Sequence, residues 1–277
     1  MTYTFPATGT IWCIEFLEKL PIEKFTQIKK EIDAQIKRDD AIYSRFNTQS
    51  ELSNLNKNKR LDNPSRQLYD ALALAEDIRL MTKDAFTPFI GTYLHQLGYD
   101  ATNRFAVEGE LTKDNSKLGR FLKLDSEVIA LPNEAHVDVS SFAKGIMIDN
   151  VVSLLKTLHL NEFVVNAGGD IFVSTQNKPV EIAIEAPTHL ADVVETVSLK
   201  NQAIATSANT KRVWIDQKTE EERSHIKTYN SDIKQVSVIA ENAKTADLLS
   251  TVIFISGDSF SKPLHSRFNF EERIYQS

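Results

Sequence analysis

The chain has 277 residues, 42% of them hydrophobic, and a formal net charge of −6 at pH 7. A chain of this length can bury a sizeable core as one large or two modest domains, whereas its acidic balance and scattered Lys and Arg residues argue against a nucleic-acid-binding surface. The single cysteine, Cys13, excludes an internal disulfide and any cysteine-rich metal site.

The N-terminal segment, residues 1–6, lacks the charged and apolar regions of a signal peptide. No later stretch approaches the roughly 18 uncharged apolar residues that a membrane-spanning helix needs. We therefore expect a cytoplasmic, soluble protein with no membrane anchor and no nucleic-acid partner.

Two amphipathic helices are predicted in the first third of the chain. The first places Phe25, Ile28, Ile32 and Ile36 at helical spacing, and the second begins at Pro64 and carries its apolar positions between residues 68 and 81. Between them, residues 44–56 form a polar loop and a short helix. Both long helices are expected to pack on a sheet.

The middle of the chain begins with a polar, aperiodic segment at residues 100–116, which is either a solvated excursion or a lid. A hairpin follows at residues 121–131, turning at Asp125-Ser126, and residues 136–139 are predicted as a strand. Helical periodicity then covers residues 142–158, with Ser140 or Ser141 as the N-cap.

Short strands dominate the rest of the chain. Residues 163–165 and 171–173 flank a turn that contains Gly168-Gly169, and further strands are expected at 181–184, 203–206 and 236–239. Helices and strands are interleaved without a repeating unit. This order predicts an α/β fold of the mixed, α+β type rather than a doubly wound parallel sheet.

The most informative chemical pattern is at residues 246–251, where Asp247, Ser250 and Thr251 follow at i, i+3 and i+4. On a helix these three side chains lie on one face. Carboxylate and hydroxyl oxygens suit Mg²⁺, which completes its coordination with water and substrate phosphates. The alternative is structural: Thr245 caps the helix and Asp247 interacts with the helix dipole.

Two other segments offer groups for an anionic ligand. At residues 138–145 a predicted strand passes into a helix, so free backbone N–H groups lie beside Lys144 and Asp138. In Gly168-Gly169-Asp170 the glycines allow a ligand to approach the backbone closely. The structural alternatives are an ordinary helix start for the first segment and an ordinary hairpin turn for the second.

His225 is a candidate general base, because an imidazole can accept a proton near neutral pH. Neither Gly-x-Gly-x-x-Gly nor the P-loop pattern occurs, which disfavours the two commonest nucleotide sites. His-Glu-x-x-His is also absent from the sequence, which disfavours a zinc protease.

In order and approximate spacing, seven segments resemble the ApbE family of FAD:protein FMN transferases. They are residues 7–10 (Ala-Thr-Gly-Thr), 44–47 with 50–52, 86–91, 138–145 with Asp149, 165–170, 205–207 and 246–251. Together they span nearly the whole chain. The resemblance implies an ApbE-type, T-fold-like α/β domain covering residues 1–277.

The resemblance also implies ligands and roles. Mg²⁺ would be bound by the backbone oxygen of Ser141 and the side chains of Asp247 and Thr251, with Ser250 nearby, and Asp247 and His225 would be the catalytic pair. The residues implied to contact FAD are Thr8, Phe46, Thr87, Pro88, Phe89, Asp138, Lys144, Gly168, Gly169, Asp170, Thr206, Ser207 and Ile226.

The implied reaction moves FMN from FAD to a Ser or Thr hydroxyl of an acceptor protein, in a motif of the Ser/Thr-Gly-Ala-Thr type, and releases AMP. This chain departs from the family pattern after His225-Ile226, where the usual Asp-Pro and final Gly are missing, and has Thr8 and Ala208 at the usual Met and Gly. Two alternatives therefore stay open: a Mg²⁺-dependent FAD pyrophosphatase, and a flavin-binding paralogue without catalysis.

Overall fold

The computed structural model describes residues 1–98, 111–112, 114–187, 192–208, 213–215, 222–224, 232–257 and 260–276. The chain divides into two compact units. Unit 1 comprises Met1–Lys37, Ser141–Thr210 and Asn230–Ser277, and unit 2 comprises Arg38–Ser140 and Lys211–Tyr229.

Unit 1 is organised around a sheet that contains seven of the described strands, in the order β1-β2-β6-β7-β10-β13-β14, with every neighbouring pair antiparallel. The strands are β1 (Thr2–Ala7), β2 (Thr10–Phe16), β6 (Phe163–Ala167), β7 (Asp170–Ser174), β10 (Gln202–Ala208), β13 (Ile233–Ala240) and β14 (Phe270–Gln276). The first and last strands of the chain therefore form the two edges of this sheet.

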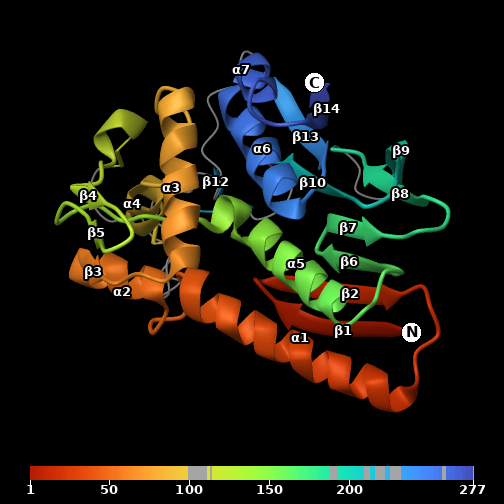
Figure 1. Ribbon diagram of the computed structural model, residues 1–277. Helices are drawn as coiled ribbons and strands as arrows, with labels where there is room; N and C mark the ends of the chain where they lie inside the picture. The colour runs from red at the N-terminus through yellow and green to blue at the C-terminus, as the bar shows by residue number, and fades with distance from the viewer. Residues whose placement is uncertain are drawn as a thin grey trace. The chain divides into compact units, whose positions relative to one another are not determined.

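Helices cover one face of the sheet (Figure 1). They are α1 (Ile22–Tyr43), which belongs to unit 1 as far as Lys37, α5 (Ser140–Thr157), α6 (Ala243–Ser256) and the short α7 (Ser261–His265). Alternation along β2 sends Trp12, Ile14 and Phe16 into the core, where all three side chains are buried. The core of unit 1 thus lies between the sheet and these helices.

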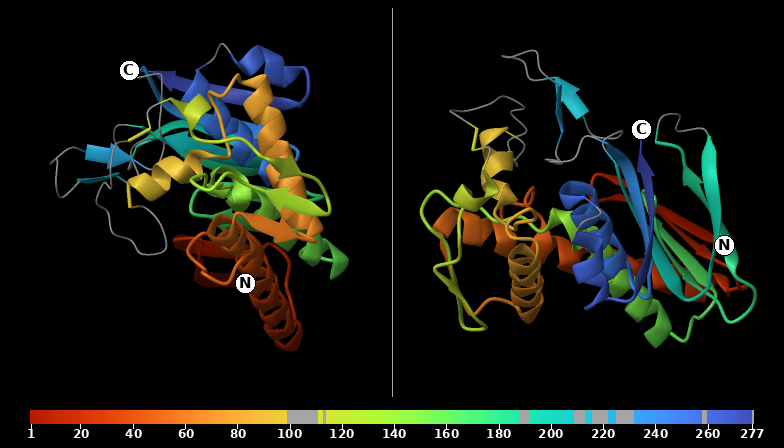
Figure 2. Two further views of the ribbon diagram at one scale, coloured as in Figure 1. Left: turned by 90° about the vertical axis from the view of Figure 1, so that its left-hand side faces the viewer. Right: turned by 90° about the horizontal axis from the view of Figure 1, so that it is seen from above.

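A separate hairpin, β8 (Val180–Glu185) and β9 (Val193–Leu199), lies on the opposite face of the sheet, as Figure 2 (right) shows. Apolar side chains of the hairpin, among them Ile184 and Val197, form one buried cluster with Val173 and Ile239 of the sheet. An ion pair of 2.9 Å between Glu195 and Arg273 reinforces the contact.

Unit 2 contains the helices α2 (Glu51–Asn58), α3 (Arg66–Met81) and α4 (Ile90–Gln96), the 3-10 turn η1 (Asn115–Lys117), a small sheet of β3 (Arg60–Asp62), β5 (Val128–Ala130) and β4 (Lys123–Leu124), and the pair β11 (Val213–Ile215) and β12 (Glu222–Ser224). Ser50 caps α2 and Ser65, the residue after Pro64, caps α3, each by accepting a hydrogen bond from a backbone N–H.

The predicted mixed α/β class is confirmed, and so are the hairpin at residues 121–131, the β6–β7 hairpin and the three later strands. The strand predicted at 136–139 is wrong. Both backbone groups of Val137 instead form hydrogen bonds of 2.8 Å with the side-chain amide of Asn56, so they are not available to a neighbouring strand. Residues 99–110 and 113 lie outside the described residues, and with them most of the predicted excursion or lid.

The predicted cap of the following helix is also wrong. α5 already begins at Ser140, which places Ser141 inside it, and the acceptor for the Ser140 N–H is Oδ1 of Asp138, at 2.7 Å. Within the part of the chain that the structure describes, no helix combines the length and the apolar character needed to cross a membrane.

Candidate active site

The helix α6 in unit 1 carries Asp247, Ser250 and Thr251 on one buried face, with exposed fractions of 7%, 0% and 6%. Its N-cap is Asn242, whose side chain accepts from the N–H of Thr245. The alternative in which Thr245 caps this helix is therefore wrong. The i, i+3, i+4 spacing therefore places three oxygen-bearing side chains close together, as the sequence predicts.

The Asp247 carboxylate faces helix α5, where its Oδ2 accepts a hydrogen bond of 2.9 Å from the backbone N–H of Gly145. The two helices touch here backbone to backbone, since a Cβ built on Gly145 would lie 2.4 Å from the carbonyl oxygen of Ala243. Only glycine fits this contact. A second carboxylate, that of Asp149, accepts from the N–H groups of Ala243 and Lys244 at 2.8 and 2.9 Å and ties the start of α6 to α5.

The hydroxyl groups of α6 meet two further elements. The Thr251 hydroxyl donates to the backbone oxygen of Ser141 on α5, at 3.2 Å. The Ser207 hydroxyl on β10 lies 3.0 Å from that of Ser250 and 3.1 Å from that of Thr251. The structure therefore brings all four predicted metal ligands into one neighbourhood and adds Ser207, which the sequence had assigned to FAD.

An ion pair between a buried carboxylate and a partly exposed lysine lies in the same unit. Lys144, one residue before Gly145 on α5, pairs with Asp170 at the start of β7. Oδ1 of Asp170 also accepts a bond of 3.3 Å from the backbone N–H of Thr206, and the Thr206 hydroxyl lies 2.8 Å from that of Ser237. Three of the predicted FAD-contacting residues, Lys144, Asp170 and Thr206, are thus connected to one another.

Two carboxyl groups, those of Asp170 and Asp247, share this cluster with the single ammonium group of Lys144. Burial raises the pKa of Asp247 well above its ordinary value, and the charge of Asp170 raises it further, while Lys144 and the Gly145 N–H oppose the shift. A buried carboxylate in such surroundings is stabilised by a cation. Within the described residues no group of three His, Cys, Asp or Glu side chains is placed to hold a metal, so the donor set here is one carboxylate with hydroxyl and carbonyl oxygens.

The two turns of unit 1 that are expected to contact FAD lie in close contact with each other. Gly168 has φ of 68°, and a Cβ on it would lie 2.2 Å from the hydroxyl oxygen of Thr10, next to the β1–β2 turn. In that turn Thr8 has φ of 51° and its hydroxyl accepts from the Trp12 indole N–H at 3.1 Å. Gly169, with φ of 107°, has open space around its Cβ position and donates its N–H to Asn166.

Unit 2 holds the remaining described residues of the predicted FAD set. Asp138 is 3% exposed, and its Oδ2 forms an ion pair of 2.8 Å with Arg45, whose guanidinium lies 4.8 Å from the ring of the exposed Phe46. The Asp138 N–H donates to the carbonyl oxygen of Pro88 at 2.8 Å. Thr87 and Phe89 are buried, and the Phe89 N–H donates to the Thr87 hydroxyl. His225 and Ile226 lie outside the described residues.

Sequence reasoning missed the parts played by Gly145 and Arg45. A lone glycine inside a helical pattern is a signal for close packing, but the pattern does not say against what. The opposite charges of Arg45 and Asp138 are 93 residues apart, and nothing in the local sequence pairs them.

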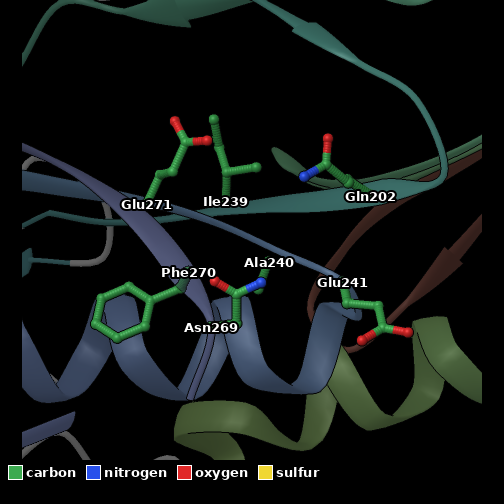
Figure 3. A pocket seen from close by; sticks show the side chains of 7 residues that line it. All are labelled: Gln202, Ile239, Ala240, Glu241, Asn269, Phe270 and Glu271. Atoms are coloured by element: carbon green, nitrogen blue, oxygen red, sulfur yellow. The ribbon is translucent and has the colours of Figure 1, made fainter. Parts of the chain in front are cut away.

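A hollow of about 270 Å³ lies elsewhere in unit 1, at the ends of β10, β13 and β14. Figure 3 shows that polar side chains surround it, including Gln202, Glu241, Asn269 and Glu271. None of the predicted site residues lines it.

The fold and the α6 cluster define a mixed α/β protein with a buried oxygen site suited to a hard cation. The model of the ApbE family matches residues 8–270, and the chain belongs to that family. It is 30% identical to the FAD:protein FMN transferase of Haemophilus influenzae, over 90% of this chain and 79% of the relative, and 26% identical to that of Vibrio cholerae, over 91% and 80%.

Solved structures agree on the fold. The flavin transferase ApbE from Vibrio cholerae superposes with a TM-score of 0.78 at 21% identity, covering 99% of this chain and 96% of that one. The ApbE protein from Thermotoga maritima gives a TM-score of 0.81 at 21% identity, covering 100% and 94%.

Proposed function

We propose that the protein is a Mg²⁺-dependent FAD:protein FMN transferase, which joins FMN to a Ser or Thr hydroxyl of an acceptor protein and releases AMP. The names of the relatives support the reaction class. The observation that carries the proposal is that Asp247, Thr251 and the Ser141 carbonyl lie together in the core of unit 1 as an all-oxygen donor set.

These residues fit Mg²⁺ because hard oxygen donors match its preference, and because one carboxylate leaves coordination positions for water and phosphate. Bound there, Mg²⁺ would offset negative charge on the pyrophosphate of FAD. Asp247, Thr251 and the backbone oxygen of Ser141 would bind the ion. Ser250 and Ser207 would fix the orientation of the Thr251 hydroxyl group. The Gly145 N–H keeps the Asp247 carboxylate in place.

In this proposal Lys144 supplies a positive charge to the phosphate that becomes part of the product. Asp170 holds the Lys144 ammonium group in position before substrate arrives. The acceptor hydroxyl attacks the FMN phosphorus, the P–O bond to AMP breaks, and His225 takes the hydroxyl proton. The product is a phosphodiester between FMN and the acceptor.

The remaining predicted contacts belong to the same proposal. They are Thr8, Gly168 and Gly169, together with Phe46, Asp138 and residues 87–89. Residues 1–277 would then act as one flavin-transferring domain, and the acceptor would be a cytoplasmic protein.

The test is to incubate the protein with FAD, Mg²⁺ and an acceptor that carries a Ser/Thr-Gly-Ala-Thr type motif, and to look for flavin fluorescence on the acceptor band of a denaturing gel. Asp247→Asn keeps an oxygen to accept from Gly145 but lacks the charge, and should abolish both the transfer and the effect of Mg²⁺. A Ser153→Ala variant on the exposed side of α5 is the matched control.

Absence of fluorescence on the acceptor would count against transfer. Full-rate formation of free FMN and AMP without acceptor would identify a pyrophosphatase, since water would then replace the hydroxyl. FAD binding that is insensitive to both Mg²⁺ and Asp247→Asn would identify a binding protein without this chemistry.

A further inference from the structure

Two consecutive residues in the loop after α3 adopt a left-handed backbone conformation: Lys83 with φ of 50° and Asp84 with φ of 69°. Residues that carry a Cβ are disfavoured in this region. They persist there when the surrounding structure holds them. The loop leads directly into residues 87–89, so the contacts of the loop determine the position and conformation of that segment.

The Asp84 carboxylate joins two parts of unit 2. One oxygen pairs with Arg79, near the end of α3, and the other pairs with Arg120 at 2.8 Å. Arg79 is itself 6% exposed and is gripped by both oxygens of Glu76, at 2.7 Å each. The guanidinium of Arg79 therefore has little freedom, and it fixes Asp84 in turn.

Backbone groups of the same loop are held as well. The Asn115 side-chain amide donates to the carbonyl oxygens of Asp84 and Ala85, at 3.1 and 3.0 Å. The Phe86 N–H donates to the buried Thr82 hydroxyl at 3.1 Å, and that hydroxyl donates to the Ile78 oxygen on α3. The loop is thus held both by the ion pairs of the Asp84 side chain and by hydrogen bonds to its backbone.

The far end of the segment rests on the same neighbours. Gly119 lies against the Phe89 ring so closely that a Cβ on it would be 2.6 Å from Cδ1 of that ring, and the rings of Phe89 and Phe121 are 4.8 Å apart. Arg120, the partner of Asp84, sits between these two contacts in the sequence. Residues 115–121 therefore support both ends of the segment from 84 to 89.

We propose that Asp84 is a positioning residue for flavin binding, which holds residues 85–89 in their binding conformation through Arg79 and Arg120. This inference rests on the proposed function, in which residues 87–89 contact FAD. A segment that is ordered before the ligand arrives loses less conformational entropy on binding. The ion pairs of Asp84 also hold a backbone conformation that its Cβ would otherwise disfavour.

The neighbouring left-handed residue provides a matched control. Asp84→Gly and Lys83→Gly each place glycine where φ is positive, and so each relieves the same kind of strain. Only Asp84→Gly also removes a carboxylate that pairs with two arginines, whereas the Lys83 side chain is exposed. We expect Asp84→Gly to raise KM for FAD by roughly five- to twentyfold with kcat within about twofold, because binding is affected and the chemical step is not. Lys83→Gly should match the wild-type protein.

A second readout does not involve FAD. Amide hydrogen exchange over residues 84–89 of the full-length protein should become faster in Asp84→Gly and stay unchanged in Lys83→Gly. Thermal unfolding of both variants checks that the fold is intact.

An intact Asp84→Gly protein with wild-type KM for FAD, or with unchanged exchange over residues 84–89, overturns the positioning role. If the wild-type protein does not bind FAD at all, the proposed function fails, and the assignment of Asp84 to flavin binding fails with it. The exchange data then still show separately whether Asp84 holds the loop.

Discussion

Replacing Gly145 with alanine tests the contact that delivers Asp247 to the candidate site. The added Cβ would lie 2.4 Å from the carbonyl oxygen of Ala243 and 2.7 Å from its carbonyl carbon. Both atoms are backbone, so no side-chain rotation can remove the clash. Helices α5 and α6 would have to separate, and the bond from the Gly145 N–H to the Asp247 carboxylate would lengthen.

Three effects set the magnitude. Overpacking of this kind costs about 1–3 kcal/mol. Weakening a hydrogen bond to a buried charged group costs about 1.5–3 kcal/mol. Alanine is the better helix former and returns about 1 kcal/mol. The unfavourable effects win, and the free energy of unfolding of Gly145→Ala should fall by about 2–4 kcal/mol.

Urea denaturation followed by circular dichroism measures this change. Ser153→Ala on the exposed side of α5 is the control, and should change the free energy of unfolding by no more than about 0.5 kcal/mol, in the stabilising direction. If Gly145→Ala proves as stable as Ser153→Ala, then α5 and α6 do not meet backbone to backbone, and the described geometry of Asp247 is wrong.

Three further outcomes are expected. Lys144→Met should lower the free energy of unfolding by about 2–4 kcal/mol in thermal or urea melts, because it leaves the carboxylate of Asp170 buried without its cation. Lys144→Arg should recover most of this loss, and equal stability of the two variants would contradict the prediction. Ser207→Ala should cost about 1–3 kcal/mol in the same melts, because two buried hydroxyls on α6 lose a partner, and an unchanged midpoint would refute the contact. Burial raises the pKa of Asp149, so the folded state binds the proton of this carboxyl group more tightly than the unfolded chain does. The stability of the wild-type protein relative to Asp149→Asn should therefore decline as the pH rises from about 4 through the raised pKa. A stability difference that does not change with pH would show that the pKa is not raised.

Local spacing was enough to predict the parts of the site that lie on one element. The common face of Asp247, Ser250 and Thr251 follows from helical periodicity, and the β6–β7 hairpin follows from its paired glycines between apolar runs. Both predictions depend only on residues close together in the chain.

Contacts between distant segments were beyond the sequence. The bond between Gly145 and Asp247 joins positions 102 residues apart, and the Asn56 side chain satisfies the backbone of Val137 across 81 residues. The contact between Asn56 and Val137 explains why residues 136–139 were wrongly predicted as a strand. Alternation of polar and apolar residues favours a strand, but it does not show whether a neighbouring strand is present to pair with it. The cap at Asn242 was missed for a different reason, because both Asn242 and Thr245 are residues that favour such positions.

The order of strands in the large sheet has a consequence for how the chain folds as it is made. β2 pairs with β6, so that Phe16 lies opposite Phe163, and the larger segment of unit 2, Arg38–Ser140, is synthesised between the two. The N-terminal hairpin, with its indole and phenyl groups, must therefore remain without its permanent neighbour while more than a hundred residues leave the ribosome. Such long-range pairing is slow and leaves apolar surface exposed in the meantime. Until residues 163–167 have been made, the edge of β2 that later pairs with them therefore has no partner strand.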